Sequence, residues 1–191
     1  MPNRAENIHS ILWHKEWNRL GEKGATVMEP IEAADLDDLG IEKIESGLRG
    51  RILRAGDADY DVARRHYNAL INKHPALIVQ CTGVADVIDA VNFARTHRLL
   101  VAVRGGGHNV SGRALVDGGM VIDLTPMKGI HVDPAQHTIW AQGGVTWGEF
   151  DRESCVFGLA TTGGLGLHDR HRGIYFRWRT RLADAKVRAG L

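Results

Sequence analysis

Three adjacent glycines and a histidine follow a short apolar run in the segment VAVRGGGHNVSG, residues 101–112. Residues without a Cβ allow the backbone to adopt positive φ and to approach a ligand closely. Successive N–H groups in such a turn can bind an anion, and the guanidinium of Arg104 is suited to phosphate. His108 adds a nucleophilic imidazole. The pattern indicates a loop for a phosphorylated cofactor; a glycine-rich hairpin with a solvated histidine is the alternative.

The loop matches neither of two common phosphate-binding motifs. A Walker A motif requires Gly-x4-Gly-Lys-Ser/Thr, and the dinucleotide motif Gly-x-Gly-x-x-Gly opens a helix. No helical pattern follows the glycines here. The ligand class therefore has to come from the rest of the chain.

The elements that must position this loop are two strands and a helix. Residues 76–81 and 99–103 are short apolar runs typical of buried strands, and residues 83–96 have apolar side chains at helical spacing. Two strands joined by a helix are expected to be parallel. The apolar stripe predicted for the helix consists of Val84, Val87, Ile88, Val91 and Ala94.

The segments on either side of this unit have clear patterns of their own. Upstream, we expect a helical lead-in over residues 31–48, a turn into a strand over 48–54, and a helix from 60 to 71. Downstream, we expect a strand over 120–124, a hairpin of 129–133 with 137–141, and a helix from 146 to 157. Thr146 and Glu149 fit a capping box at the start of that helix, with Phe150 and Cys155 facing inward.

Composition bounds the function classes. The chain has 191 residues, a net charge of +1, 43% hydrophobic and 25% charged residues, which is ordinary for a globular domain or part of one. We expect no binding to nucleic acid or to a membrane surface. No signal-peptide pattern and no apolar run of about 18 residues is present, which predicts no membrane span and a cytoplasmic location.

The cysteines and histidines predict no metal site. Cys81 and Cys155 form neither a CxxC motif nor a zinc pattern, and their apolar neighbours predict two buried thiols. His131 and His137 lie on opposite sides of the predicted hairpin, and His168 precedes His171 by three positions. Neither pair has a third ligand at a convincing spacing.

Several segments together resemble the FAD-binding domain of the para-cresol methylhydroxylase (PCMH)/vanillyl-alcohol oxidase superfamily, in particular bacterial berberine-bridge-enzyme-like FAD-linked oxidases. The matching segments, in matching order and spacing, are 75–81, 84–94, 101–109, 117–124, 127–129, 143–148 and 158–164, and the lead-in over 48–75 is also similar. The resemblance implies an α+β fold class. It would be an incomplete PCMH-type FAD-binding domain, with an N-terminal βαβ subdomain and the start of a second, β-rich subdomain.

The resemblance also implies a cofactor and the residues that bind it. In such proteins the loop after the second strand binds the pyrophosphate of FAD. The FAD-binding residues implied here are Arg104, Gly105, Gly106, Gly107, His108, Asn109, Thr161, Thr162, Gly163 and Gly164. His108 is the candidate for a covalent bond to the flavin 8α-methyl group. Because residues 160–164 contain no cysteine, we expect at most one covalent link.

The implied reaction is two-electron oxidation of a small organic substrate by hydride transfer to the flavin, with reoxidation by dioxygen. No catalytic residue for the substrate can be assigned. The alternative is a non-catalytic remnant or interaction fragment that binds no flavin.

The resemblance ends after residue 164, where the sequence becomes rich in arginine. We divide the chain into an N-terminal extension (1–30), a helical lead-in (31–73), a partial FAD-binding domain (74–164) and an atypical tail (165–191). The tail is interpreted as an out-of-frame translation, so the substrate domain is expected to be missing. Its basic and aromatic residues lack a nucleic-acid-binding fold motif.

Overall fold

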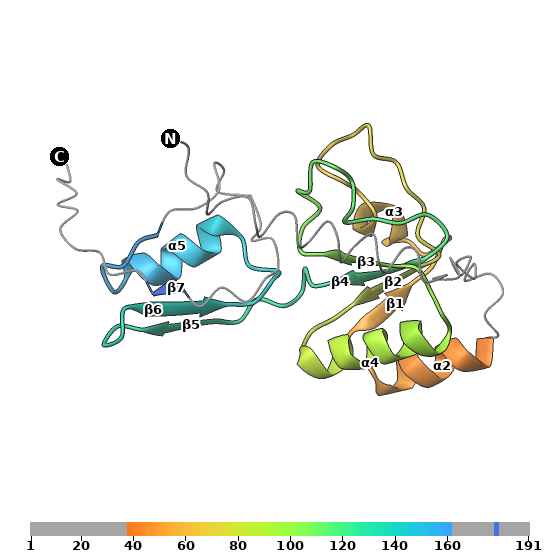
Figure 1. The fold of residues 1–191 in the computed structure, drawn as a ribbon, viewed down its shortest axis with the longest axis horizontal. Helices are drawn as coiled ribbons and strands as arrows, with labels where there is room; N and C mark the ends of the chain where they lie inside the picture. The colour runs from red at the N-terminus through yellow and green to blue at the C-terminus, as the bar shows by residue number, and fades with distance from the viewer. Residues whose placement is uncertain (1–37, 162–177, 180–191) are drawn as a thin grey trace, which may run out of the picture.

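The computed structural model describes residues 38–161 and 178–179, and in this part the chain forms two sheets at opposite ends of Figure 1. We call residues 38–127 the first lobe and residues 128–161 with 178–179 the second lobe. The first lobe contains α2 (Asp38–Gly47), β1 (Arg51–Leu53), α3 (Tyr60–Ala63), β2 (Leu77–Gln80), α4 (Val84–Thr96), β3 (Val101–Arg104) and β4 (Met120–Asp123). The second lobe contains β5 (Ile130–Asp133), β6 (Thr138–Ala141), α5 (Trp147–Cys155) and β7 (Trp178–Arg179). No helix within the described ranges is long and apolar enough to cross a membrane.

The first sheet has the strand order β1-β2-β4-β3. Strands β2 and β3 both run parallel to β4, and β1 is antiparallel to β2. The predicted βαβ unit is therefore confirmed in direction, but its two strands are not neighbours, because β4 lies between them. All four residues of β4 are buried, as expected for a central strand covered on both faces.

Two core clusters cover the two faces of this sheet. Along β2, Leu77 and Val79 belong to the cluster under α2 and α4, and Ile78 belongs to the cluster under α3. This alternation follows the period of two in a strand. Figure 1 shows α2 and α4 together on one face and α3 on the other. The continuous apolar runs in the sequence thus reflect burial on both faces.

Helix α4 packs on the sheet with a different face from the one predicted by its apolar stripe. Val84, Ile88 and Val91 are about half exposed, so the predicted apolar stripe is wrong at these positions. The buried residues of the helix are Asp86, Ala90, Phe93 and Ala94. The small alanines allow close packing on the sheet. The buried Asp86 carboxylate accepts hydrogen bonds from the N–H groups of Thr82 and Arg49. These bonds compensate for its loss of water.

The helix predicted over residues 60–71 is also wrong, because α3 ends at Ala63. Beyond it, side chains bind the local backbone and replace helical hydrogen bonds. The Asn68 N–H donates to Nδ1 of His66 at 3.1 Å, and the Leu70 N–H donates to Oδ1 of Asn68 at 3.1 Å. Tyr67 and Leu70, which would share one apolar face of the predicted helix, are exposed.

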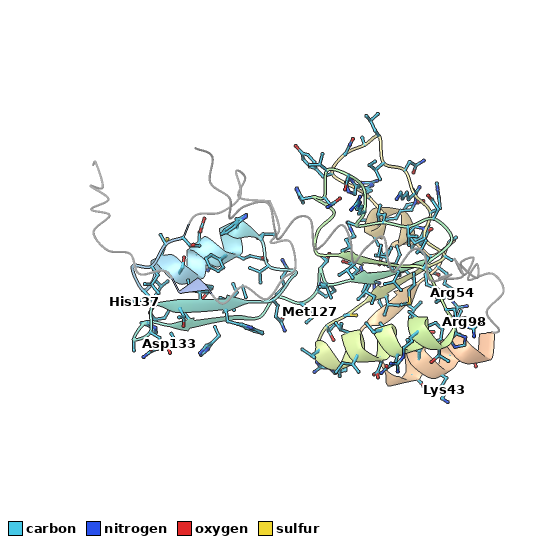
Figure 2. All side chains as sticks on the ribbon, in the orientation of Figure 1. Lys43, Arg54, Arg98, Met127, Asp133 and His137 are labelled. Carbon is cyan, nitrogen blue, oxygen red and sulfur yellow. The ribbon has the colours of Figure 1, made fainter. Side chains whose placement is uncertain are left out.

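The second lobe is a hairpin covered by one helix. Strands β5 and β6 are antiparallel, as predicted, and β7 extends this sheet. The capping box of Thr146 and Glu149 is present at the start of α5. Figure 2 shows Asp133 and His137 at the far end of the hairpin and Met127 where the lobes meet. Cys155 is exposed, so the prediction that it is buried is wrong: α5 ends there and buries Phe150 and Ser154 instead.

The remaining predicted segments lie outside the described residues. These are the N-terminal extension, the first part of the lead-in, and the arginine-rich tail except for β7.

Candidate flavin site

The glycine loop begins at the carboxyl edge of the parallel strands. It follows β3, and the chain leaves β2 and β4 at the same edge, because Gln80 and Arg104 both align with Asp123. Ligands of open parallel sheets bind outside this edge. The position of the loop therefore agrees with a binding role.

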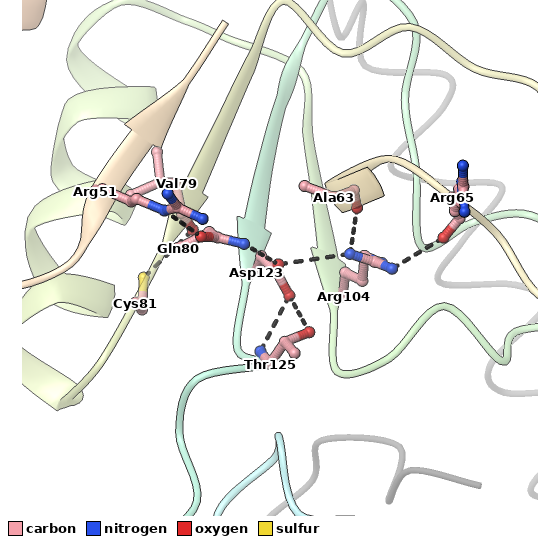
Figure 3. Close-up of polar contacts among 9 residues, drawn as sticks. All are labelled: Arg51, Ala63, Arg65, Val79, Gln80, Cys81, Arg104, Asp123 and Thr125. Atoms are coloured by element: carbon pink, nitrogen blue, oxygen red, sulfur yellow. Dashed lines mark hydrogen bonds and ion pairs between the residues drawn. The ribbon is translucent and has the colours of Figure 1, made fainter. Parts of the chain in front are cut away.

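The Arg104 side chain is buried and directed into the protein (Figure 3). Its Nη1 donates to the carbonyl oxygen of Ala63, and its Nη2 donates to the carbonyl oxygen of Arg65 at 2.9 Å. Nη1 also lies 3.5 Å from Oδ2 of Asp123. The guanidinium thus ties the base of the glycine loop to residues 63–65. Binding of phosphate by this side chain stays a prediction.

Asp123 is the buried centre of a chain of polar side chains that crosses the sheet in Figure 3. Its Oδ2 accepts from Nε2 of Gln80 at 3.2 Å, and Gln80 in turn accepts from Nε of Arg51 at 2.8 Å. Its Oδ1 accepts from the N–H and hydroxyl of Thr125, at 3.0 and 2.5 Å. Asp123 is fully buried, and such a charge is tolerated only when it is paired and hydrogen-bonded. This chain fixes the ends of β2, β3 and β4 relative to one another.

The glycine triplet presents backbone donors. Within the described residues, the N–H groups of residues 105–107 donate no hydrogen bond. Gly107 has φ of 76°, and a Cβ there would lie 3.2 Å from Nε of Arg104 and 3.3 Å from the carbonyl oxygen of Arg65. Only glycine adopts this conformation readily in so little space. The triplet therefore offers a cradle of N–H groups that an anion can occupy.

His108 stands at the exit of the loop, stacked on Tyr67. The two ring centroids are 4.9 Å apart and the planes are inclined by 23°. The backbone N–H of Tyr67 donates to the carbonyl oxygen of Gly107 at 3.1 Å. The imidazole is partly exposed, so a cofactor at the loop can reach it.

Asn109 closes the turn after His108 rather than facing a ligand. Its Oδ1 accepts from Oγ of Ser111 at 2.7 Å and from the N–H of Arg113 at 3.1 Å. The ammonium of Lys73 donates to the carbonyl oxygens of Gly112 and Leu115. These contacts hold the segment after the loop against the segment before β2.

The second predicted loop is only partly described. Thr161 follows α5 in the second lobe, and Thr162, Gly163 and Gly164 lie outside the described residues. The Thr161 hydroxyl is buried and has no hydrogen-bond partner among the described residues. Buried polar atoms in proteins are usually hydrogen-bonded to protein, water or a ligand. The orphaned hydroxyl and the unpaired glycine N–H groups both fit a cofactor with phosphate and hydroxyl groups.

Sequence analysis missed two residues of this region. Asp123 had a usable signal, because it is a lone carboxylate within the apolar run of residues 120–124. Tyr67 had none, because its contact with His108 depends on a chain path that departs from the predicted helix. No group of three or more His, Cys, Asp or Glu side chains in the described ranges is arranged to hold a metal ion.

The fold is that of the FAD-binding domain of PCMH-type flavoenzymes. Residues 75–170 match the FAD binding domain family, and this match spans half of the chain. The chain therefore belongs to this family, in its PCMH-type, berberine-bridge-enzyme-like branch, as the sequence predicted.

Known relatives agree in sequence and in structure. (R)-6-hydroxynicotine oxidase of Paenarthrobacter nicotinovorans is 35% identical over 118 residues, which cover 62% of this chain and 26% of the relative. An FAD-linked oxidoreductase of Bacillus subtilis is 34% identical, with coverage of 61% and 26%. The crystal structure of 6-hydroxy-D-nicotine oxidase from Arthrobacter nicotinovorans is 34% identical with a TM-score of 0.61, covering 63% of this chain and 27% of that one. The chain spans about a quarter of the length of these relatives.

Proposed function

We propose that this chain is the FAD-binding part of an FAD-linked oxidoreductase and that its glycine loop binds the cofactor pyrophosphate. The observation that carries the proposal is the cradle of unpaired N–H groups at residues 105–107, placed at the carboxyl edge of three parallel strands. Arg104 holds the start of this loop against Arg65, and Asn109 holds the turn that follows the loop. Thr161, Thr162, Gly163 and Gly164 are the candidates for a second contact with the cofactor.

The bound flavin supplies two-electron chemistry: a hydride from a small organic substrate reduces it, and dioxygen reoxidises it. His108 is the candidate for covalent attachment, because a neutral imidazole is a competent nucleophile. Attachment joins an imidazole nitrogen to the 8α carbon. In such an attachment the imidazole nitrogen and the 8α carbon would each lose one hydrogen as a proton, and the two electrons released would pass to dioxygen to give hydrogen peroxide.

The first test is a visible spectrum of the full chain purified with FAD, recorded before and after acid precipitation. Flavin that stays with the pellet indicates a covalent bond, which His108→Ala should abolish. Flavin released to the supernatant indicates a non-covalent site. A soluble, folded, colourless protein would contradict the proposal and favour a remnant that binds no flavin.

A pair of glycine variants separates loop geometry from general instability. Gly107→Ala places a Cβ against Arg104 and the Arg65 carbonyl and should weaken FAD binding at least tenfold. Gly56→Ala imposes comparable backbone strain, because Gly56 has φ of 102°, but no atom lies within 4 Å of its Cβ position. Gly56→Ala should leave the dissociation constant of FAD unchanged. Equal weakening by both variants would remove the glycine loop from the site.

A further inference from the structure

The segment 63–67 follows the glycine loop and touches it at every second residue. The carbonyl oxygens of Ala63 and Arg65 accept hydrogen bonds from the Arg104 guanidinium. Tyr67 then makes two contacts, one from its N–H to the Gly107 carbonyl oxygen and one from its ring to the imidazole of His108. The segment thus ends at a residue that contacts His108, the candidate for covalent attachment.

The place of the Tyr67 ring is not explained by hydrophobic burial. Tyr67 is 75% exposed, so its ring is not held by a core. Its offset-stacked geometry with the imidazole, at 4.9 Å and 23°, is the arrangement that aromatic pairs prefer. The hydrogen bond to Gly107 fixes the backbone on which this stack depends. The two contacts therefore restrict both the backbone before His108 and the plane of its ring.

We propose that Tyr67 is a positioning residue for His108, which holds the imidazole plane in one orientation so that the ring meets the cofactor in a reactive geometry. This inference rests on the proposed function, because it concerns the same site. A misplaced reacting group loses up to about a hundredfold in rate. Loss of the Tyr67 ring is thus expected to slow covalent attachment and to leave the affinity for FAD nearly unaltered.

The stack itself is tested without any cofactor. In the full chain labelled with 13C at histidine Cε1, the His108 signal is identified as the one that His108→Gln removes. Shielding by the Tyr67 ring should place this signal upfield of the signals of exposed histidines. Tyr67→Phe keeps a ring and should keep the shift, and Tyr67→Leu should move the signal downfield. An unshifted signal in the wild-type chain would overturn the proposal and leave the proposed function intact.

The role in attachment is tested by the rate at which acid-stable flavin forms after FAD is added to the apo chain. Tyr67→Leu should slow this rate by about tenfold or more, and Tyr67→Phe should restore it to within about twofold. The dissociation constant of FAD, measured at short times, should change little in either variant. Leu70→Ala is the matched control, because Leu70 is also exposed, lies three residues after Tyr67 and should have no effect.

The outcomes separate the two proposals. If the wild-type chain attaches flavin and Tyr67→Leu does so equally fast, the positioning role is wrong and the proposed function stands. If the wild-type chain binds FAD but never attaches it, covalent attachment and the role of Tyr67 fail together, while the FAD site stands. If Tyr67→Leu loses FAD binding itself, Tyr67 supports the whole loop, and its specific action on His108 is rejected.

Discussion

The two lobes differ in how far their sheets are buried. The first lobe covers its sheet on both faces and has two core clusters, with fully buried residues on β2 and β4. In the second lobe, no residue of β5 or β6 is fully buried, and the core there is limited to residues such as Val145 and Phe150. The glycine loop is thus anchored in the lobe with the larger core, and Thr161 belongs to the lobe with the smaller core.

The two lobes therefore differ in how firmly they hold the loops that they carry. Arg104 and Asp123 fix the base of the glycine loop from within the first lobe. The second lobe relies on local devices, chiefly the capping box of α5 and the ion pair of Lys128 with Glu149. Elements with few buried contacts open at lower free energy than a core. We therefore expect the two lobes to respond differently to probes of packing.

Thiol labelling should show the largest difference. Burial, helped by the nearby carboxylates of Asp86 and Asp123, raises the pKa of Cys81 to about 12, whereas Cys155 is exposed on α5. A thiol-specific reagent at neutral pH should label Cys155 at once. It should label Cys81 on the order of a thousandfold more slowly, since the first lobe must open first. In Cys155→Ser only the slow phase should remain; a fast phase there would show that the first lobe lacks a stable core.

Removal of the buried carboxylate should have the next largest effect. Asp123→Ala leaves the Arg104 guanidinium without its buried counter-charge and should lower the free energy of unfolding of the first lobe by about 3–5 kcal/mol. Asp133→Ala on the hairpin is the control. Within the part of the chain that the structure describes, the Asp133 carboxylate accepts a turn N–H from Gln136, and its loss should change stability by less than about 1 kcal/mol. Hydrogen exchange of β2 and β4 amides is the measurement, and equal effects of the two variants would contradict the comparison.

The fold was predictable where the pattern of apolar residues decides it. The strands at residues 76–81 and 120–124, the hairpin and the capping box are local features, and the sequence predicts each of them correctly. The insertion of β4 between β2 and β3 is a non-local choice, and residue spacing says nothing about it. The order of strands depends on which one has both faces buried.

The place of the glycine loop at the end of β3 was predictable, but the contacts that support the loop were not. The glycine triplet marks the loop directly, because few other residues tolerate its conformation. The Arg104 side chain was expected to face a ligand, but the carbonyls of Ala63 and Arg65 and the Asp123 carboxylate surround it in the fold. Those partners are 19 to 41 positions away in sequence. Local sequence patterns do not predict contacts between residues so far apart in the chain.

Truncation of matched isoleucines should sharpen the contrast in packing. Ile78 on β2 is fully buried, and Ile78→Ala should lower the stability of the first lobe by about 2–5 kcal/mol through lost burial and a residual cavity. Ile139 on β6 is only partly buried, and Ile139→Ala should lower the stability of the second lobe by about 1 kcal/mol. In a chain with Trp13 and Trp17 replaced by Phe, tryptophan fluorescence reports the second lobe, since Trp140 and Trp147 lie there and residues 38–127 contain no tryptophan. Similar losses in the two variants would mean that the lobes are packed alike.

The smallest effect is expected at the cap of α5, where it depends on pH. Burial alone would raise the pKa of Glu149, but hydrogen bonds from Lys128 and Thr146 outweigh burial and lower the pKa to about 2 from an ordinary 4.5. A lowered folded-state pKa contributes stability that is present above pH 4.5 and is lost as the pH falls toward 2. Because both side chains of the ion pair are well exposed, solvent screening keeps its contribution small.

Glu149→Gln tests this dependence while it preserves the shape of the cap. Glutamine can still accept the hydrogen bonds of the capping box, but it loses the ion pair with Lys128, whose Nζ lies 2.6 Å from Oε2. The variant should lower the stability of the second lobe by about 0.5–1 kcal/mol at pH 7, and the difference from the wild-type chain should vanish as the pH falls from 4.5 to 2. Fluorescence-monitored unfolding across this range gives both quantities. A difference that persists unchanged at pH 2 would place the effect in helix capping geometry, and the second lobe would then owe nothing to the charge of Glu149.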